Sequence, residues 1–283
     1  MRPWHGVLVA TAVPFRDGQV DLDTYGEHVR WLTENGCDGV VPNGSLGEYQ
    51  VLTAAEREAV MKTAVAAGAR AVVPGVAAYG AIEARAWAQK AAEAGCQAVM
   101  LLPPNAYRAD EAAVMAHYRE VAKAGLPIVA YNNPYDTKVD LTPALLARLH
   151  GEGLIVAVKE FSGDVRRAYE IAELAPELDL LVGADDVLLE LLAAGAVGWI
   201  AGFPNSLPRE CVELYEKRDI GLYRRLHPLL RWDSKTEFVQ AIKLSMDLAG
   251  RYGGPCRPPR LPLGAQAEAA VRKAMSSMVE AVL

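Results

Sequence analysis

Short apolar runs alternate with longer amphipathic runs along most of the chain. The short runs are rich in β-branched residues, and most end in Pro, Gly or Asn, as buried parallel strands do where they reach a loop. They cover Val7–Phe15, Gly39–Asn43, Ala71–Val76, Ala98–Leu102, Pro127–Tyr131, Leu154–Lys159, Leu178–Val182 and Ala196–Ala201. The pattern predicts eight strands, all within about the first 210 residues.

The longer runs have the spacing of helices that bury one face. Thr53 with Glu56 three residues later predicts a capping box at a helix start, and Pro143 after Thr142 suits the first helical position. The predicted helices are Asp21–Glu34, Ala54–Ala67, Ala81–Ala94, Glu111–Ala124, Pro143–Leu149, Val165–Ala175 and Val187–Ala194, with a further helical stretch after Pro208.

Eight successive strand–helix units predict an α/β fold, a (β/α)8 TIM barrel over residues 1–209. Residues 210–283 are predicted to be a C-terminal helical extension packed on the barrel, ending in a helix near Ala265–Val282. The alternative is a doubly wound open sheet followed by helices. That fold would require a glycine-rich phosphate-binding turn after an early strand. Neither G-x-G-x-x-G nor G-x-x-x-x-G-K-[ST] occurs, and this favours the barrel.

Composition narrows the class of protein. The 283 residues are 52% hydrophobic and 23% charged, which excludes a disordered chain. A net charge of −6 without a Lys/Arg cluster predicts no nucleic-acid partner, and no apolar run is long enough to predict a membrane span. Cys37, Cys96, Cys211 and Cys256 form no C-x-x-C pair, so we expect reduced thiols in a cytoplasmic protein without a signal peptide.

In a barrel of this kind the chemistry lies at the carboxyl ends of the strands. Of the nine lysines, Lys159 stands apart because it ends a strand that should be buried on both faces. Burial should lower the pKa of its amine and leave part of it neutral, as imine formation with a carbonyl substrate needs. The plainer alternative is an ion pair with Glu160, although residues that alternate along a strand point to opposite faces.

Three further features border the same predicted rim. Tyr131 ends the preceding strand, where its hydroxyl could relay protons or simply belong to a core aromatic. Gly44 and Gly47 flank Ser45 in a loop whose exposed N–H groups would suit a carboxylate. The adjacent pair Asp185-Asp186 is as consistent with a helix cap as with a site. No metal-ligand spacing occurs, so we expect no metal and no cofactor.

Together these blocks resemble the dihydrodipicolinate synthase / N-acetylneuraminate lyase family of class I, Schiff-base-forming lyases. The resemblance runs from Gly6 to about Leu263. It is carried by Gly44–Glu48 (G-[ST]-x-G-E), Tyr131–Pro134 (Y-N-x-P), Val158–Glu160, Gly183–Asp186 and Gly195–Ile200.

The resemblance implies roles for these residues. Lys159 would form the imine with a 2-oxo acid, Tyr131 would relay protons, and Ser45 would join the relay. Substrate-binding positions would be Gly44, Leu46, Gly47, Asn133, Gly183, Asp185 and Ile200. It also implies a small-molecule substrate, no cofactor, and assembly into a homotetramer or dimer.

Some positions depart from the synthases of this family. Their arginine after Y-N-x-P is Asp136 here, with Lys138 two residues on, and their interface tyrosine aligns with Ala106, beside Tyr107. The second threonine of their G-T-T-G-E loop is Leu46.

Within the family the chain is similar to Δ1-pyrroline-4-hydroxy-2-carboxylate deaminases of hydroxyproline breakdown. This closer resemblance lies in Gly44–Glu48, Tyr131–Pro134, Asp164–Arg167 and Gly195–Gly202. That reaction is the first hypothesis. The alternatives are 4-hydroxy-tetrahydrodipicolinate synthase, a 2-oxo-acid aldolase or sugar-acid dehydratase, and a non-enzymatic sensor or scaffold. Candidates to bind the distal end of the substrate are Asn133, Asp136, Lys138 and Asn205.

Overall fold

The computed structural model describes residues 2–279. Its main sheet is parallel and has the strand order β4-β1-β9-β8-β7-β6-β5. These strands are β1 (Gly6–Ala10), β4 (Gly39–Val41), β5 (Val99–Leu101), β6 (Ile128–Asn132), β7 (Ala157–Glu160), β8 (Asp179–Val182) and β9 (Gly198–Ala201).

The segment Ala71–Val76 closes the ring between β4 and β5. Isolated bridges tie it to both neighbours, at Val40↔Val72 and Gly75↔Met100. Pro74 has no N–H to donate in the middle of the segment, which explains why bridges form in place of the continuous strand we predicted. With this eighth member the fold is the predicted α/β TIM barrel.

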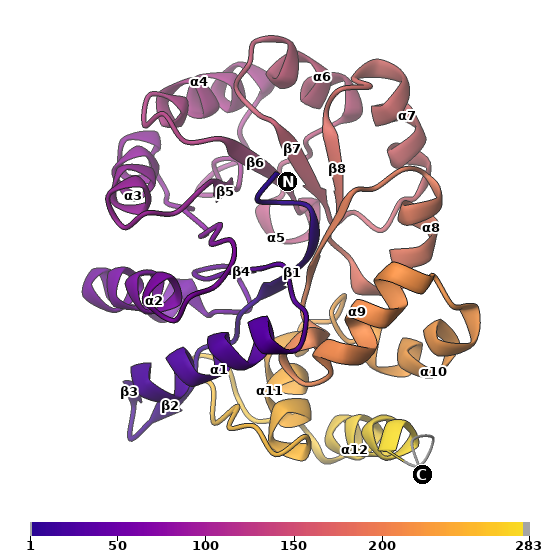
Figure 1. Ribbon diagram of the computed structural model, residues 1–283. Coiled ribbons are helices and arrows are strands. Elements are labelled where there is room, and N and C mark those ends of the chain that lie inside the picture. The colour runs from indigo at the N-terminus through magenta and orange to yellow at the C-terminus, as the bar shows by residue number, and fades with distance from the viewer. Residues whose placement is uncertain (1, 280–283) are drawn as a thin grey trace.

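A ring of helices surrounds the strands (Figure 1). The predicted capping box is present, because Thr53 accepts from Glu56 N and Glu56 from Thr53 N, and Thr142 caps the helix that Pro143 begins. The helices of the ring are α1 (Leu22–Glu34), α2 (Ala54–Ala66), α3 (Ala81–Glu93), α4 (Glu111–Ala122), α6 (Pro143–Gly151), α7 (Arg166–Leu174), α8 (Leu188–Ala193) and α9 (Pro208–Lys217).

The first apolar run is divided, contrary to our prediction of one strand over Val7–Phe15. β1 stops at Ala10, and β2 (Phe15–Arg16) pairs antiparallel with β3 (Gln19–Val20) in a separate hairpin. Asp17 and Gly18, with φ of 50° and 75°, make the tight turn between them. Other short elements are α5 (Pro134–Thr137), η1 (Tyr49–Val51), η2 (Asp185–Val187) and η3 (Phe203–Asn205).

Three helices follow the ring: α10 (Ile220–Leu230), α11 (Phe238–Leu248) and α12 (Ala265–Val279). α12 packs against α10 and α11, and the three lie together at the lower edge of Figure 1. Residues 280–282 of the predicted last helix lie outside the described residues. α9 spans the predicted boundary between 1–209 and 210–283, and that division stays a prediction.

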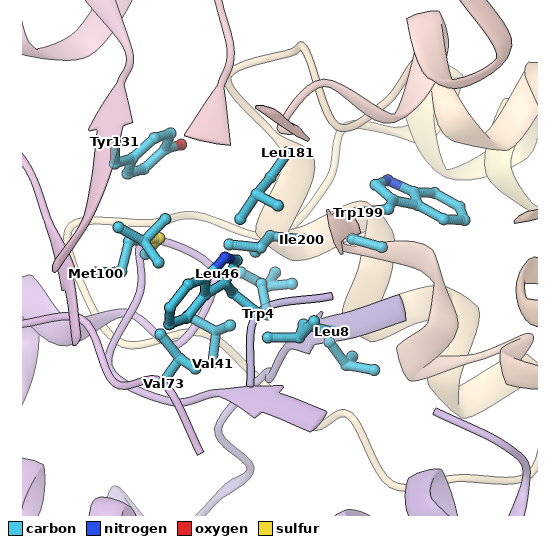
Figure 2. Close-up of a cluster of buried hydrophobic side chains, with 14 of the residues drawn as sticks. Trp4, Leu8, Val41, Leu46, Val73, Met100, Tyr131, Leu181, Trp199 and Ile200 are labelled. Carbon is cyan, nitrogen blue, oxygen red and sulfur yellow. The ribbon is translucent and has the colours of Figure 1, made fainter. Parts of the chain in front are cut away.

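Apolar side chains from different sides of the ring meet inside the barrel (Figure 2). Four of them are fully buried there: Leu8 on β1, Val41 on β4, Leu181 on β8, and Val73 in the segment Ala71–Val76. This packing fills the interior, so a ligand must bind at one end of the barrel rather than through it.

The cysteines are all free, and Cys37, Cys96 and Cys211 are buried. Among the described helices, none combines the length and the apolar character that crossing a bilayer requires. A cytoplasmic location remains a prediction.

Candidate active site

A cavity of about 1130 Å³ lies at the carboxyl ends of the strands. Among its lining residues are predicted ones from several strands and loops: Gly44, Ser45, Leu46, Tyr131, Asn133, Lys159 and Ile200. Gly47, Gly183 and Asp185, which were also predicted to contact substrate, are not among the lining residues. The structure therefore brings most of the predicted site to one surface and leaves three members behind it.

Lys159 and Tyr131 face the cavity side by side. They are register partners on the parallel strands β6 and β7, so their side chains point to the same face. Lys159 Nζ lies 4.3 Å from the centre of the Tyr131 ring, and the lysine is only 6% exposed.

The surroundings of Lys159 favour its neutral form. Burial lowers the pKa of its amine, and the charges of Asp233 and Asp185 oppose that shift only in part. Glu160 turns away and accepts hydrogen bonds from Asn132 Nδ2 at 3.0 Å and Ser162 N at 2.6 Å. Within the described residues Lys159 makes no ion pair, so the alternative of a pair with Glu160 is wrong.

Gly183 makes room for the lysine strand. A Cβ on this residue would lie 2.5 Å from Glu160 O and 3.0 Å from Lys159 Cγ. A side chain at this position would clash with the end of β7, which explains why the residue is glycine. Gly183 itself does not line the cavity.

The Tyr131 phenol is buried and hydrogen-bonded. Its Oη accepts from Asn133 Nδ2 at 3.3 Å, and its ring meets Phe161 edge-on at 6.2 Å. Burial, followed by the charge of Asp233, raises the pKa of Tyr131. A phenol that keeps its proton can donate it and take it back, as a relay requires. Ser45 lines the same cavity, but no hydrogen bond between Ser45 and Tyr131 occurs in the part of the chain described.

The Asn43–Glu48 loop presents free donors. Asn43 and Glu48 adopt the left-handed conformation, with φ of 57° and 52°. Over the described residues, the N–H groups of Ser45 and Leu46 donate to no carbonyl, which leaves them available to an incoming carboxylate.

Glu48 fixes this loop to the extension. Its Oε1 lies 2.6 Å from Lys243 Nζ on α11, with both side chains 1% exposed, and its Oε2 accepts from Arg257 N at 3.1 Å. The position of the loop therefore depends on α11 and on the segment that follows it.

Asp185 fastens β8 to β9 instead of facing the cavity. Its carboxylate accepts from Trp199 Nε1 at 2.9 Å and from Gly202 N at 3.1 Å, and burial raises its pKa to about 6. Asn205 also hydrogen-bonds the scaffold, because its Nδ2 donates to Ala10 O at 2.7 Å. Both polar groups thus hydrogen-bond the scaffold in this structure, and the substrate contacts expected of them stay a prediction. Neither aspartate of the Asp185-Asp186 pair caps α8.

The distal rim carries both charge signs. Asp136 lines the cavity and accepts from Asn133 Nδ2 at 2.8 Å. Lys138 also lines it and donates to Tyr135 O. Tyr107 is 59% exposed and, like Ala106, lies away from the lining.

Two buried ionisable residues from the extension were not predicted: one lines the cavity, and the other holds the Asn43–Glu48 loop. Lys243 could have been found, because it lies four residues after Val239 on the buried stripe of α11. Asp233, in the segment between α10 and α11, lines the cavity, and its place in the sequence carries no such signal.

Within residues 2–279 no three His, Cys, Asp or Glu side chains gather so that they could hold a metal ion. The expectation that the protein needs no cofactor stays a prediction.

Comparison with known proteins gives a consistent relationship. The family model described as the dihydrodipicolinate synthetase family matches residues 3–278. A 4-hydroxy-tetrahydrodipicolinate synthase from Methanothrix thermoacetophila is 34% identical over 97% of each chain. A dihydrodipicolinate synthase structure from Aquifex aeolicus superimposes with a TM-score of 0.92 at 27% identity, covering 98% of each chain.

A further structural match is YagE, a prophage protein of the dihydrodipicolinic acid synthase family from E. coli K12 in complex with pyruvate. It has a TM-score of 0.90 and 27% identity, over 97% of this chain and 98% of YagE. None of these matches supports the predicted closer resemblance to pyrroline-carboxylate deaminases. They agree on the broader relationship: this chain belongs to the dihydrodipicolinate synthetase family and is a lyase.

Proposed function

We propose that this protein forms a Schiff base between Lys159 and a small 2-oxo acid such as pyruvate. The observation that carries the proposal is a buried lysine that has no ion-pair partner among the described residues. It lies at the surface of a cavity that also presents Tyr131 and the free N–H groups of Ser45 and Leu46.

The geometry suits each step of imine formation. The N–H groups of Ser45 and Leu46 bind the substrate carboxylate, and the neutral amine of Lys159 attacks C2 of the oxo acid. Tyr131 gives its proton to the C2 oxygen and regains one from the ammonium formed on attack, which leaves a neutral carbinolamine. Tyr131 then gives this second proton to the C2 hydroxyl, which leaves as water, and the iminium remains on the lysine. A proton taken up from solvent restores the phenol and balances the step.

For the overall reaction we propose first the condensation of pyruvate with aspartate semialdehyde, the 4-hydroxy-tetrahydrodipicolinate synthase reaction. Its support is the name shared by the relatives that are 31–34% identical to this chain. The iminium would lose a C3 proton, and the enamine would attack the aldehyde.

A second candidate is the deamination of 1-pyrroline-4-hydroxy-2-carboxylate. It is favoured by Asp136 at the cavity rim, where a cation would be needed to bind the carboxylate of the semialdehyde. This substrate is already a cyclic imine, so exchange onto Lys159 would be easier than attack on a ketone.

Borohydride reduction in the presence of pyruvate, followed by intact-mass measurement, tests the Schiff base. We expect one reduced adduct on the protein and none on Lys159→Ala. Lys217→Ala, which removes an exposed lysine of α9, is the control and should be labelled fully. An adduct that survives Lys159→Ala would refute the proposal.

The rates of the two overall reactions in the native protein and in Asp136→Arg show which reaction the protein catalyses. If the protein is a synthase, condensation should be the faster reaction in the native protein and should rise further in the variant. If it is a deaminase, ammonia release from the pyrroline should dominate and should fall in the variant.

Assembly into a homotetramer or dimer, proposed from the family resemblance, is tested by light scattering.

A further inference from the structure

Asp233 lies over the ends of two barrel strands, although it belongs to the extension. Its side chain lines the cavity that also contains Lys159. Its Oδ2 accepts from Asp185 N, which follows β8, and a Cβ on Gly202, which follows β9, would lie 3.1 Å from its Oδ1. In sheet order β7 lies between β6 and β8, so Tyr131 is on one side of the Lys159 strand and the strand ends that Asp233 contacts are on the other.

The two buried aspartates near Lys159 differ in their hydrogen bonds. Asp185 accepts from three donors and does not reach the cavity. Asp233 accepts a single long bond of 3.4 Å through Oδ2, and within the described chain its Oδ1 accepts none. Oδ1 is not among the fully buried atoms that lack a partner, so this oxygen is open to the cavity and available to a bound ligand.

The charges around Asp233 favour proton exchange. Burial raises its pKa, the neighbouring Asp185 and Asp186 raise it further, and Lys159 lowers it. A carboxyl group with a raised pKa binds and releases a proton more readily near neutral pH than an exposed aspartate does.

We propose that Asp233 is a further catalytic residue, which takes a proton from C3 of the substrate bound to Lys159. This inference rests on the proposed Schiff base. The C3–H bond breaks, its electron pair forms the C2–C3 double bond, the iminium becomes a neutral enamine, and the proton moves to Asp233.

The proton then leaves Asp233 again, so the residue returns to its starting form. In a condensation it passes to the aldehyde oxygen as the enamine attacks. In an elimination it passes to the leaving hydroxyl, which departs as water. Tyr131 serves the oxygen on C2, and Asp233 serves the hydrogen on C3.

Exchange of the pyruvate methyl protons in D2O, followed by proton NMR, isolates this step without a second substrate. Borohydride trapping of the same samples measures the iminium. Asp233→Asn should trap as much pyruvate as the native protein but exchange about 10²-fold more slowly or worse. Asp233→Glu should recover part of the rate. Glu237→Gln removes an exposed carboxylate four residues away and should change neither quantity.

Normal trapping with unchanged exchange in Asp233→Asn would overturn this inference and leave the Schiff base intact. Absence of an adduct in the native protein would overturn both. If Asp233→Asn does not fold, Tyr131→Phe provides a second test. Tyr131→Phe should form less iminium but exchange C3 protons at the native rate per trapped iminium, and loss of exchange there would assign the step to Tyr131.

Discussion

Two lysines in the described part of the chain are buried, and their surroundings differ. Lys243 on α11 lies 2.6 Å from Glu48 and also donates to Pro255 O at 2.9 Å. Lys159 on β7 is nearly as buried, yet it rests on the ring of Tyr131 with its nearest carboxylates at a distance.

The difference shows that burial alone does not make a lysine reactive. A buried ammonium beside a carboxylate recovers part of its lost hydration through the ion pair. A buried amine without such a partner recovers little and releases its proton more easily. Lys243 therefore belongs to the scaffold, whereas burial lowers the pKa of Lys159 and shifts its amine toward the neutral form that a nucleophile needs.

The largest expected effect comes from exchanging each lysine for methionine and measuring turnover. Lys159→Met should lower kcat/KM by about 10⁴-fold or more, because no other group can form the imine. Lys243→Met should still form the pyruvate adduct on Lys159. Loss of the adduct in folded Lys243→Met would show that the two lysines are not separable.

For the free energy of unfolding, the larger loss should occur in Lys243→Met and not in Lys159→Met. Lys243→Met leaves Glu48 buried without its cation, so we expect the free energy of unfolding to fall by about 3–5 kcal/mol in urea denaturation. The double variant Glu48→Gln/Lys243→Met should recover a large part of that loss. Lys159→Met should unfold at the same or a higher urea concentration, and a loss like that of Lys243→Met would contradict the comparison.

Tyr131→Phe should reduce kcat by about 10²-fold with KM changed only a few-fold, because it removes a proton carrier and leaves the carboxylate loop intact. Tyr118→Phe is the matched control, since this buried hydroxyl donates to Leu101 O away from the cavity. Its kcat should stay at the native value. An increase in KM alone in Tyr131→Phe would make the tyrosine a binding residue.

The smallest effect is a pH dependence of stability. The pKa of Lys159 is lowered in the folded protein, so between that pKa and 10.5 the unfolded chain binds a proton that the folded chain does not. Stability from this group must therefore rise with pH through that window, by at most ~1.4 kcal/mol per pH unit.

Urea denaturation from pH 7 to 9 should show the native protein gaining stability relative to Lys159→Met. An exposed control, Lys273→Met, should run parallel to the native protein. A native protein that loses stability relative to Lys159→Met as the pH rises would reverse the sign and refute the lowered pKa.

The parts predicted from sequence are those that depend on local pattern. The eight units follow from periodicity within each segment, and the strand ends of a barrel must meet at one rim. Lys159 and Tyr131 could therefore be brought together from sequence alone. Pro74 shows the limit of this reasoning, since one missing N–H changed a predicted strand into bridges.

The parts missed depend on packing between distant segments. Nothing near Glu48 in the sequence indicates that a lysine from α11 lies beside it, and nothing near Lys159 indicates Asp233. Asp185 and Asn205 show the converse, because a polar residue at a strand end can face the cavity or hold a neighbouring loop. Only the three-dimensional contacts distinguish these cases.

The ion pair between Glu48 and Lys243 also affects the order in which the protein matures during synthesis. The two residues are 195 positions apart, so at ~5–20 residues per second the ribosome adds Lys243 roughly 10–40 s after Glu48. Until then the carboxylate of Glu48 has no counter-ion in its buried position. A nascent barrel that already contains Lys159 must wait for the extension to emerge and pack before the Asn43–Glu48 loop is held in place, so this lysine is made well before the cavity around it is complete.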